Sequence, residues 1–149
     1  MKFIADVMLG RLVKRLRLLG FDVLYDRMLS DNEIIRLSLE QDRTILTRDT
    51  GLAARPLAAC HLFITSDQIQ EQIDQVLAFV PPHLDVRPLT RCTTCNERLI
   101  PITKEDLHDR VPPYVYEKYS TFVQCTVCGR IYWQGTHVKK MNIGGIKTT

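Results

Sequence analysis

Residues 3–25, FIADVMLGRLVKRLRLLGFDVLY, predict a strand, a helix and a second strand in direct succession. The apolar residues change from a short continuous run to a spacing of three and four, which is typical of an amphipathic helix, and Gly20 ends that helix. The alternation continues to Val80, with strands at 44–47 and 62–64 and helices that begin at Ser30 and Ile69. Strands that alternate with helices predict an α/β fold, in which helices cover both faces of a parallel sheet.

Acidic residues follow these strands. Asp6, Asp49 and Asp67 stand at the carboxyl ends of three predicted strands, and Asp31 and Glu33 open the helix after another. In such a sheet, ligands bind beyond the carboxyl ends of the strands. Carboxylates gathered there suit Mg²⁺ or Mn²⁺, which take their other ligands from water and substrate phosphate. We therefore regard these five acids as candidate catalytic residues, with Asp6, Asp49 and Asp67 as the candidate Mg²⁺ or Mn²⁺ ligands.

Each acid alone also has a structural interpretation. Asp is a favoured N-cap of helices, Glu33 matches a capping box with Ser30, and Asp31 would favour the helix dipole. A shared metal site is preferred because the acids recur at successive strand ends. The sequence does not decide whether Asp31 or Glu33 is the fourth acid. Asp22 and Asp26 flank the second strand in a loop-like context and are left out of the site.

Four cysteines form two Cys-x-x-Cys pairs separated by 29 residues: Cys92 and Cys95, then Cys125 and Cys128. This spacing is typical of a closed, structural zinc site with four thiolate ligands. Disulfides are the alternative. No signal peptide precedes Met1-Lys2-Phe3-Ile4, so we expect a reducing, cytoplasmic compartment, which disfavours them. The fifth cysteine, Cys60, lies in an apolar stretch and is expected to be a small core residue.

The charge of the chain is unevenly distributed over its 149 residues. Residues 1–90 carry a net charge of −1 (11 basic, 12 acidic) and residues 91–149 carry +4 (9 basic, 5 acidic). No apolar run is long enough to span a membrane. The mild basic bias is compatible with nucleic acid. The candidate RNA contacts are Arg11, Lys14, Arg15 and Arg17 on the first helix, Arg48, His137, Lys139 and Lys140. A solvated helix face is the alternative for the first four.

The region between the cysteine pairs predicts a small metal-dependent unit. Residues 103–106 resemble the start of a short helix, and Pro112-Pro113 are expected to end that segment. The aromatic residues Tyr114, Tyr116, Tyr119 and Phe122 follow. We expect them to build the core of the unit and to dock it on the first domain, with stacking on unpaired bases as the alternative.

These motifs together resemble a known family. Asp6, Ser30-Asp31-x-Glu33-Ile34, Leu46-Thr47-Arg48-Asp49 and Ser66-Asp67 resemble the PIN fold of metal-dependent nucleases. The second half is similar to the Mut-seven C-terminal RNase domain family, in Arg91-Cys92-x-x-Cys95-Asn96, Arg110-Val111-Pro112-Pro113, Cys125-x-x-Cys128-Gly129-Arg130 and Tyr132-Trp133-Gln134-Gly135-Thr136-His137. The resemblance extends from Phe3 to about Met141.

The resemblance implies a three-layer α/β/α nuclease domain over residues 1–85, a zinc ribbon over 86–141 and a flexible tail over 142–149. It also implies a ribonuclease that hydrolyses phosphodiester bonds with Mg²⁺ or Mn²⁺, while the ribbon assists RNA docking. By position, Asp6 matches the acid after the first strand, Asp49 the acid of the Thr-x-Asp motif and Asp67 the late acid of the PIN pattern. A non-catalytic RNA-binding or adaptor protein with the same fold is the main alternative, and a toxin-like protein held by a partner is another. Whether the chain forms a homodimer stays open.

Overall fold

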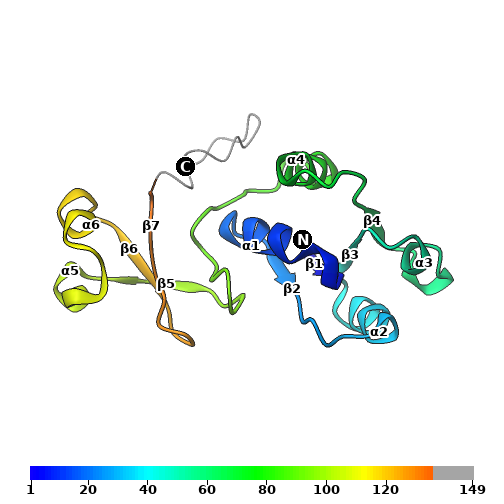
Figure 1. Cartoon of the computed structure of the whole chain (residues 1–149), viewed down its shortest axis with the longest axis horizontal. Helices are drawn as coiled ribbons and strands as arrows, with labels where there is room; N and C mark the ends of the chain where they lie inside the picture. Colours follow the sequence, from blue (N-terminus) through cyan, green and yellow to red (C-terminus); the bar gives the residue numbers. More distant parts are fainter. Residues whose placement is uncertain (136–149) are drawn as a thin grey trace.

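The structure is a computed structural model that describes residues 1–135, apart from the side chain of His108. Two units lie next to each other along the long axis of the molecule (Figure 1). We call them the sheet unit (residues 1–80) and the ribbon (residues 90–135). The expected RNA contacts His137, Lys139 and Lys140, and the expected tail 142–149, lie outside the described residues.

The sheet unit contains four parallel strands. They are β1 (Lys2–Ala5), β2 (Asp22–Leu24), β3 (Thr44–Thr47) and β4 (His61–Phe63), in the spatial order β2-β1-β3-β4. Register pairs Phe3 with both Val23 and Thr44. The chain moves from β1 to one neighbour and then returns to the other side, so the order reverses between β1 and β3. The expected parallel sheet is confirmed, and sheets of this kind commonly bind ligands at such a reversal.

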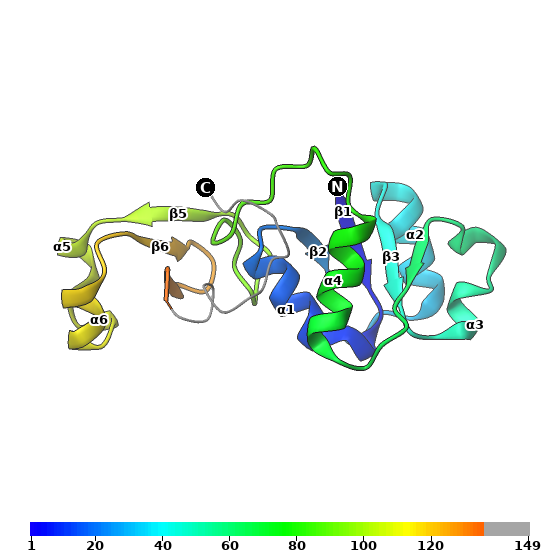
Figure 2. The same ribbon diagram turned by 90° about the horizontal axis from the view of Figure 1, so that it is seen from above.

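Helices cover both faces of the sheet (Figures 1 and 2). The helices on one face are α1 (Gly10–Leu18) and α4 (Ile69–Phe79); those on the other are α2 (Asp31–Gln41) and α3 (Thr50–Ala53). Phe3 and Ala5 pack in the core with α1 and α4, whereas Ile4 packs in the core with α2. Successive strand side chains point to opposite faces, so the alternation produces the three α/β/α layers. Two 3-10 turns, η1 (Val7–Leu9) and η2 (Pro56–Ala58), complete the unit.

The ends of the helices follow from local sequence. The capping box predicted for α2 is confirmed, since Ser30 Oγ accepts from the Glu33 backbone and Glu33 accepts from the Ser30 backbone. Gly20 follows α1 with φ 97°, a conformation that favours glycine. A Cβ at Gly20 would lie 2.2 Å from the Arg87 carbonyl oxygen, so the segment that leads to the ribbon packs directly on this turn.

The ribbon is a small antiparallel sheet with helical connections. Its strands are β5 (Leu99–Ile102), β6 (Phe122–Cys125) and β7 (Ile131–Trp133), in that spatial order. The helical segments α5 (Lys104–Leu107), η3 (His108–Arg110) and α6 (Pro113–Lys118) join β5 to β6. Phe122 is fully buried, and Tyr119 and Trp133 pack against its cluster. Tyr114 and Tyr116 are exposed, so only part of the expected aromatic core forms.

The helical segment expected from residue 103 ends at Arg110, before Pro112-Pro113, and Pro113 then begins α6, a helix that the sequence did not predict. One local expectation is wrong. Cys60 is exposed at the start of β4 and its sulfur lies 3.5 Å from the Thr44 hydroxyl, so it is not a core residue. Within residues 1–135, no helix is both long and apolar enough to cross a membrane.

Candidate acidic site and cysteine cluster

Asp6 and Asp49 meet at the hydroxyl of Thr47, where β1 and β3 end. Asp6 directly follows β1 and is buried, and its backbone N–H donates to Leu46. The Thr47 hydroxyl donates to Asp6 Oδ2 at 2.9 Å and accepts from the Asp49 backbone N–H at 2.9 Å. One side chain therefore fixes both acidic residues at the position where the strand order reverses.

The carboxylate of Asp49 also begins α3. Its Oδ1 accepts from the backbone N–H groups of Gly51 at 2.7 Å and Leu52 at 3.3 Å. Within residues 1–135, no hydrogen bond reaches Oδ2 of Asp49 or Oδ1 of Asp6. Each acid therefore keeps one carboxylate oxygen for another ligand.

Arg48 lies between these residues in sequence and carries a buried guanidinium nitrogen. Its Nη1 has no hydrogen-bond partner within the described part of the chain. Arginine remains charged in proteins, and a buried donor without an acceptor is costly.

The other three predicted acids are more peripheral. Asp67 is exposed and its Oδ1 accepts from the Gln68 side chain at 3.0 Å. Glu33 Oε2 accepts from both the backbone and the hydroxyl of Ser30, and these hydrogen bonds lower the pKa of Glu33. Asp31 is exposed in the first turn of α2, and its carboxylate makes no hydrogen bond or ion pair within residues 1–135.

The acids fit a divalent cation only in part. Within the described residues, the four cysteines are the only group of three or more His, Cys, Asp or Glu side chains that lies close enough to hold one ion. Thr47 links the Asp6 carboxylate with the backbone of Asp49, but Asp67, Asp31 and Glu33 do not complete a metal-holding group with them. Mg²⁺ is commonly held by one or two carboxylates together with water and substrate phosphate, so a group of three acids is not a requirement.

The four cysteines have the geometry of a zinc site. Their sulfur atoms all lie within 4.8 Å of one another, and Cys92 Sγ is 3.7 Å from Cys128 Sγ. A tetrahedron with Zn–S bonds of about 2.3 Å has sulfur–sulfur edges of about 3.8 Å. The cluster could therefore hold one zinc ion.

The two cysteine pairs form matching turns. Asn96 and Gly129, the residues after Cys95 and Cys128, have φ of 61° and 74°. The Asn96 N–H donates to the Cys92 carbonyl at 3.0 Å, and the Gly129 N–H donates to the Cys125 carbonyl at 2.9 Å. The positive φ of both residues turns the chain tightly, so the two sulfurs of each pair face the same point.

Tyr132 completes the surroundings of the cluster. Its hydroxyl lies 3.2 Å from Cys92 Sγ and accepts from the Thr93 backbone N–H at 3.0 Å. Burial raises the pKa of the Cys92 thiol, but hydrogen bonds from Tyr132 and from the backbone of Cys95 outweigh it and lower the pKa to about 6. Burial and the neighbouring sulfurs raise the pKa of Cys95 to about 12.

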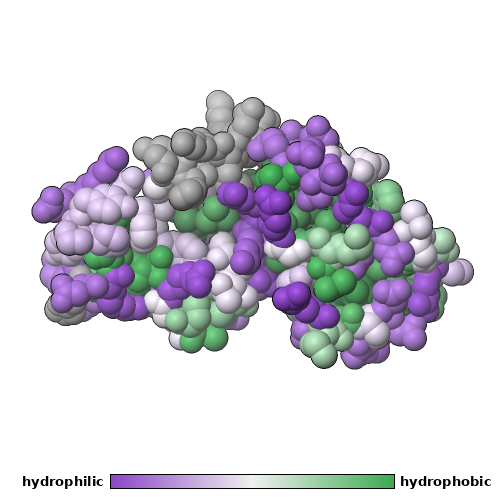
Figure 3. All heavy atoms as spheres, in the orientation of Figure 1, coloured by the Kyte–Doolittle hydropathy of each residue, from purple (hydrophilic) through white to green (hydrophobic). Residues whose placement is uncertain are grey.

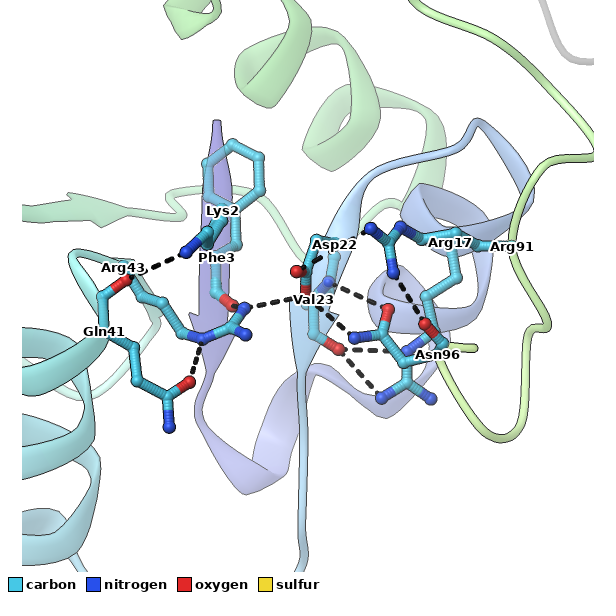
Figure 4. A network of polar contacts seen from close by, with 9 residues as sticks. All are labelled: Lys2, Phe3, Arg17, Asp22, Val23, Gln41, Arg43, Arg91 and Asn96. Carbon is cyan, nitrogen blue, oxygen red and sulfur yellow. Dashed lines mark hydrogen bonds and ion pairs between the residues drawn. The ribbon is translucent and has the colours of Figure 1, made fainter. Parts of the chain in front are cut away.

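The first cysteine turn is attached to the sheet unit through Arg17, whose hydrogen bonds to Val23 are drawn in Figure 4. Arg17 is buried on α1, and its Nη1 donates to the carbonyls of Thr93 and Thr94, both at 3.0 Å. Its Nε and Nη2 donate to the Val23 carbonyl at 3.0 and 2.8 Å. The sequence suggested an RNA contact or a solvated position for Arg17, but the guanidinium is used inside the molecule.

Asn96 and Asp22 form the second part of this attachment, and we call the whole set of contacts the junction. Asn96 Oδ1 accepts from the Val23 N–H at 3.1 Å, and Asn96 Nδ2 donates to Asp22 at 2.8 Å (Figure 4). Arg43 also donates to Asp22, at 2.8 Å. Since β2 is an edge strand, Arg17 and Asn96 supply the partners that a further strand would give to Val23.

Sequence reasoning missed these junction residues. Asp22 was excluded because it was expected in a loop, whereas it is the first residue of β2. Asn96 and Asp22 are 74 positions apart, and no local pattern joins them. The only available signal was the asparagine directly after a cysteine pair, at a position where glycine would suffice for the turn.

A comparison with protein families identifies the chain. A family model described as the Mut7-C RNAse domain matches residues 1–143. Comparison with curated proteins gives no significant match, and neither does comparison with solved structures.

Proposed function

The chain belongs to the Mut7-C RNAse domain family, and from this premise we propose that it is a metal-dependent ribonuclease. The reacting phosphodiester would lie at the carboxyl ends of β1 and β3. The observation that carries the proposal is the Thr47 hydroxyl, which holds Asp6 and Asp49 together at the reversal of strand order. Family membership supports a nuclease-like role, and the acid pair supports this location.

Asp6 and Asp49 would hold Mg²⁺ or Mn²⁺ through their remaining carboxylate oxygens, and Asp67 would contribute through water. When bound, such an ion lowers the pKa of a water molecule and offsets phosphate charge. Asp31 is preferred over Glu33 as the further acid because the capping box already occupies Glu33. Arg48, which directly precedes Asp49, would help to position the bound strand.

We also propose that Cys92, Cys95, Cys125 and Cys128 bind structural zinc and that residues 1–85 and 86–141 act as two domains. Four thiolates would leave zinc no open position for substrate, so zinc would stabilise the ribbon and the junction. The ribbon would then assist RNA docking by holding its basic residues beside the sheet unit.

The test uses variants that preserve the local hydrogen bonds. In Asp6→Asn and Asp49→Asn, the amide oxygen can still accept from Thr47 or from Gly51 and Leu52, so both proteins should fold. Each should cleave single-stranded RNA in Mn²⁺ at least about 100-fold more slowly, the scale expected for loss of one preorganised electrostatic contact. Asp74→Asn, an exposed site on α4, is the matched control and should retain the wild-type rate. Equal rates in all four proteins would refute the proposal.

A second candidate function is a non-catalytic RNA-binding or adaptor protein. It is favoured by the caps that Asp49 and Glu33 provide, because these contacts explain two of the acids without catalysis. This function predicts that the wild-type protein binds RNA equally well with and without Mn²⁺ and cleaves none. Cleavage that depends on Mn²⁺ and on Asp6 would exclude it.

A further inference from the structure

A basic cleft runs between the sheet unit and the ribbon. Its volume is about 660 Å³, and five of its twelve lining residues are basic while none is acidic. Figure 3 shows the molecule hollowed between its two lobes, with hydrophilic residues at the margins of the hollow. We call this space the junction cleft. Its walls are α1, the segment after β2 and the two cysteine turns.

The charges in the junction cleft are not neutralised by acids. Arg11 and Lys14 lie three residues apart on α1 and therefore on the same face, while Arg27 and Arg130 line the cleft from other segments. All four are exposed, and none belongs to the ion pairs found within residues 1–135. Arg17 also lines the cleft, but its donors are used by backbone carbonyls. Four cations therefore remain for an anionic ligand.

One end of the junction cleft is formed by the turn that follows β1. Val7 and Met8, the residues directly after Asp6, line the cleft and are 45% and 65% exposed. The Tyr25 hydroxyl donates to the Val7 carbonyl at 2.9 Å. A Cβ at Gly10 would lie 2.9 Å from that hydroxyl, so the glycine leaves room for the ring. The turn after β1 thus adds exposed apolar side chains to a cleft whose charged side chains are all basic.

This arrangement suits a single nucleic-acid strand. The part of α1 from Gly10 to Arg17 is about 10 Å long at 1.5 Å per residue, which limits the bound segment to a few nucleotides. The cleft volume is that of a small-ligand site, which admits a few nucleotides of one strand and not a duplex. A basic groove with exposed apolar surface binds both the phosphates and the faces of unpaired bases.

We propose that the junction cleft binds the single-stranded RNA segment next to the phosphate held at Asp6. Phosphates contact Arg11, Lys14, Arg27 and Arg130, and an unpaired base packs on Val7 and Met8. The assignment of the occupant as RNA rests on the proposed ribonuclease function. The cleft spans both units, so RNA binding requires the ribbon in its folded position.

The experiment measures binding apart from cleavage. A labelled single-stranded RNA is titrated by fluorescence anisotropy with the full zinc-loaded chain, without Mg²⁺ or Mn²⁺, at several salt concentrations. The variant Arg11→Gln/Lys14→Gln/Arg130→Gln removes three cleft cations. Its matched control, Lys2→Gln/Arg36→Gln/Lys118→Gln, removes three exposed cations that do not line the cleft. Circular dichroism and zinc content establish that both variants are folded.

The cleft variant should bind the RNA at least about 10-fold more weakly than the wild type. The slope of log affinity against log salt should also become shallower by about 2, because each of the three lost phosphate contacts contributes about 0.7 for a single strand. The control should keep both values. Equal losses in the two variants, no loss in the cleft variant, or equally good competition by duplex RNA would each overturn the proposal. Cleavage in Mn²⁺ is measured separately on the same proteins, so failure of cleavage and failure of the cleft are separate outcomes.

Discussion

Replacement of Arg17 by methionine is expected to separate the unfolding of the ribbon from that of the sheet unit. Methionine retains an unbranched apolar chain in the buried position but removes all four guanidinium hydrogen bonds. The carbonyls of Val23, Thr93 and Thr94 lose their charged donor. Two of these three carbonyls belong to the ribbon, so most of the loss falls on the junction.

The size of the effect follows from these three carbonyls. Hydrogen bonds to charged groups contribute about 1.5 kcal/mol each at the lower end of their range, which gives a gross loss of about 4–5 kcal/mol. Burial of the guanidinium opposes this, and burial also lowers the pKa of Arg17. We expect a net loss of about 3 kcal/mol. With a urea dependence of about 2 kcal/mol per molar, the unfolding midpoint of the ribbon should fall by about 1.5 M.

Trp133 makes the two units distinguishable, because it is the only tryptophan and lies in β7 of the ribbon. Its fluorescence reports the ribbon, whereas far-ultraviolet circular dichroism mainly reports the helices of the sheet unit. The two urea transitions should coincide in the wild type and separate in Arg17→Met. Lys14→Met, which removes an exposed cation from the same helix, should leave them coincident. Arg17→Lys should recover less than half of the loss, since lysine lacks the planar fork. Coincident, unshifted transitions in Arg17→Met would refute the reasoning.

Three further predictions concern the same region. Chelation of zinc at neutral pH should unfold the ribbon and remove hydrogen-exchange protection from the Val23 amide, because that amide donates to Asn96. The amides of β3 should stay protected. A protected Val23 amide after chelation would contradict this prediction. Burial would raise the pKa of Asp22, but hydrogen bonds from Arg43 and Asn96 outweigh it and lower the pKa below 3.8. The charge of Asp22 therefore stabilises the folded chain above that pH, so Asp22→Asn should lower the free energy of unfolding by about 1 kcal/mol at pH 7, measured with urea. The difference from wild type should vanish as the pH falls below 3.8. A difference that grows in acid would contradict this pKa shift. Gly20→Ala should lower the free energy of unfolding in urea by at least about 2 kcal/mol, because residue 20 has a positive φ and its new Cβ would lie 2.2 Å from the Arg87 carbonyl oxygen. An unchanged free energy of unfolding would show that the segment around Arg87 can move away.

Most of the sheet unit could be predicted from the sequence because its elements follow local rules. The strand at 44–47 matches exactly the range of β3, while the strand expected at 62–64 is β4 shifted by one residue. The apolar spacing and the capping box fixed the helices α1 and α2. α3 was missed because four residues cannot show a helical repeat. The helix α6 was missed because proline both ends helices and begins them, and the choice depends on the following residues.

The site was predictable to the extent that it depends on strand ends. The topology brings Asp6 and Asp49 together, since both follow central strands. Asp67 follows the edge strand β4 after a longer loop, and strand order alone does not place its side chain. The role of Thr47 was not predicted, because a hydroxyl that links two acids depends on register between β1 and β3. The junction depends on packing between distant segments, which no pattern in one segment can show.

The two edges of the parallel sheet explain why the ribbon matters to the sheet unit. The outer edge of β4 is covered from within the same unit, since Gln75 on α4 donates to the Phe63 carbonyl at 2.7 Å and accepts from the Thr65 N–H at 3.1 Å. The outer edge of β2 is different, because the N–H of Val23 is bonded to Asn96 of the ribbon. Asn96 holds that position because it directly follows Cys95 in a turn that a zinc ion would fix. A metal at the cysteine cluster would thus complete the edge of the sheet, and the same contact would hold the ribbon wall of the junction cleft against α1.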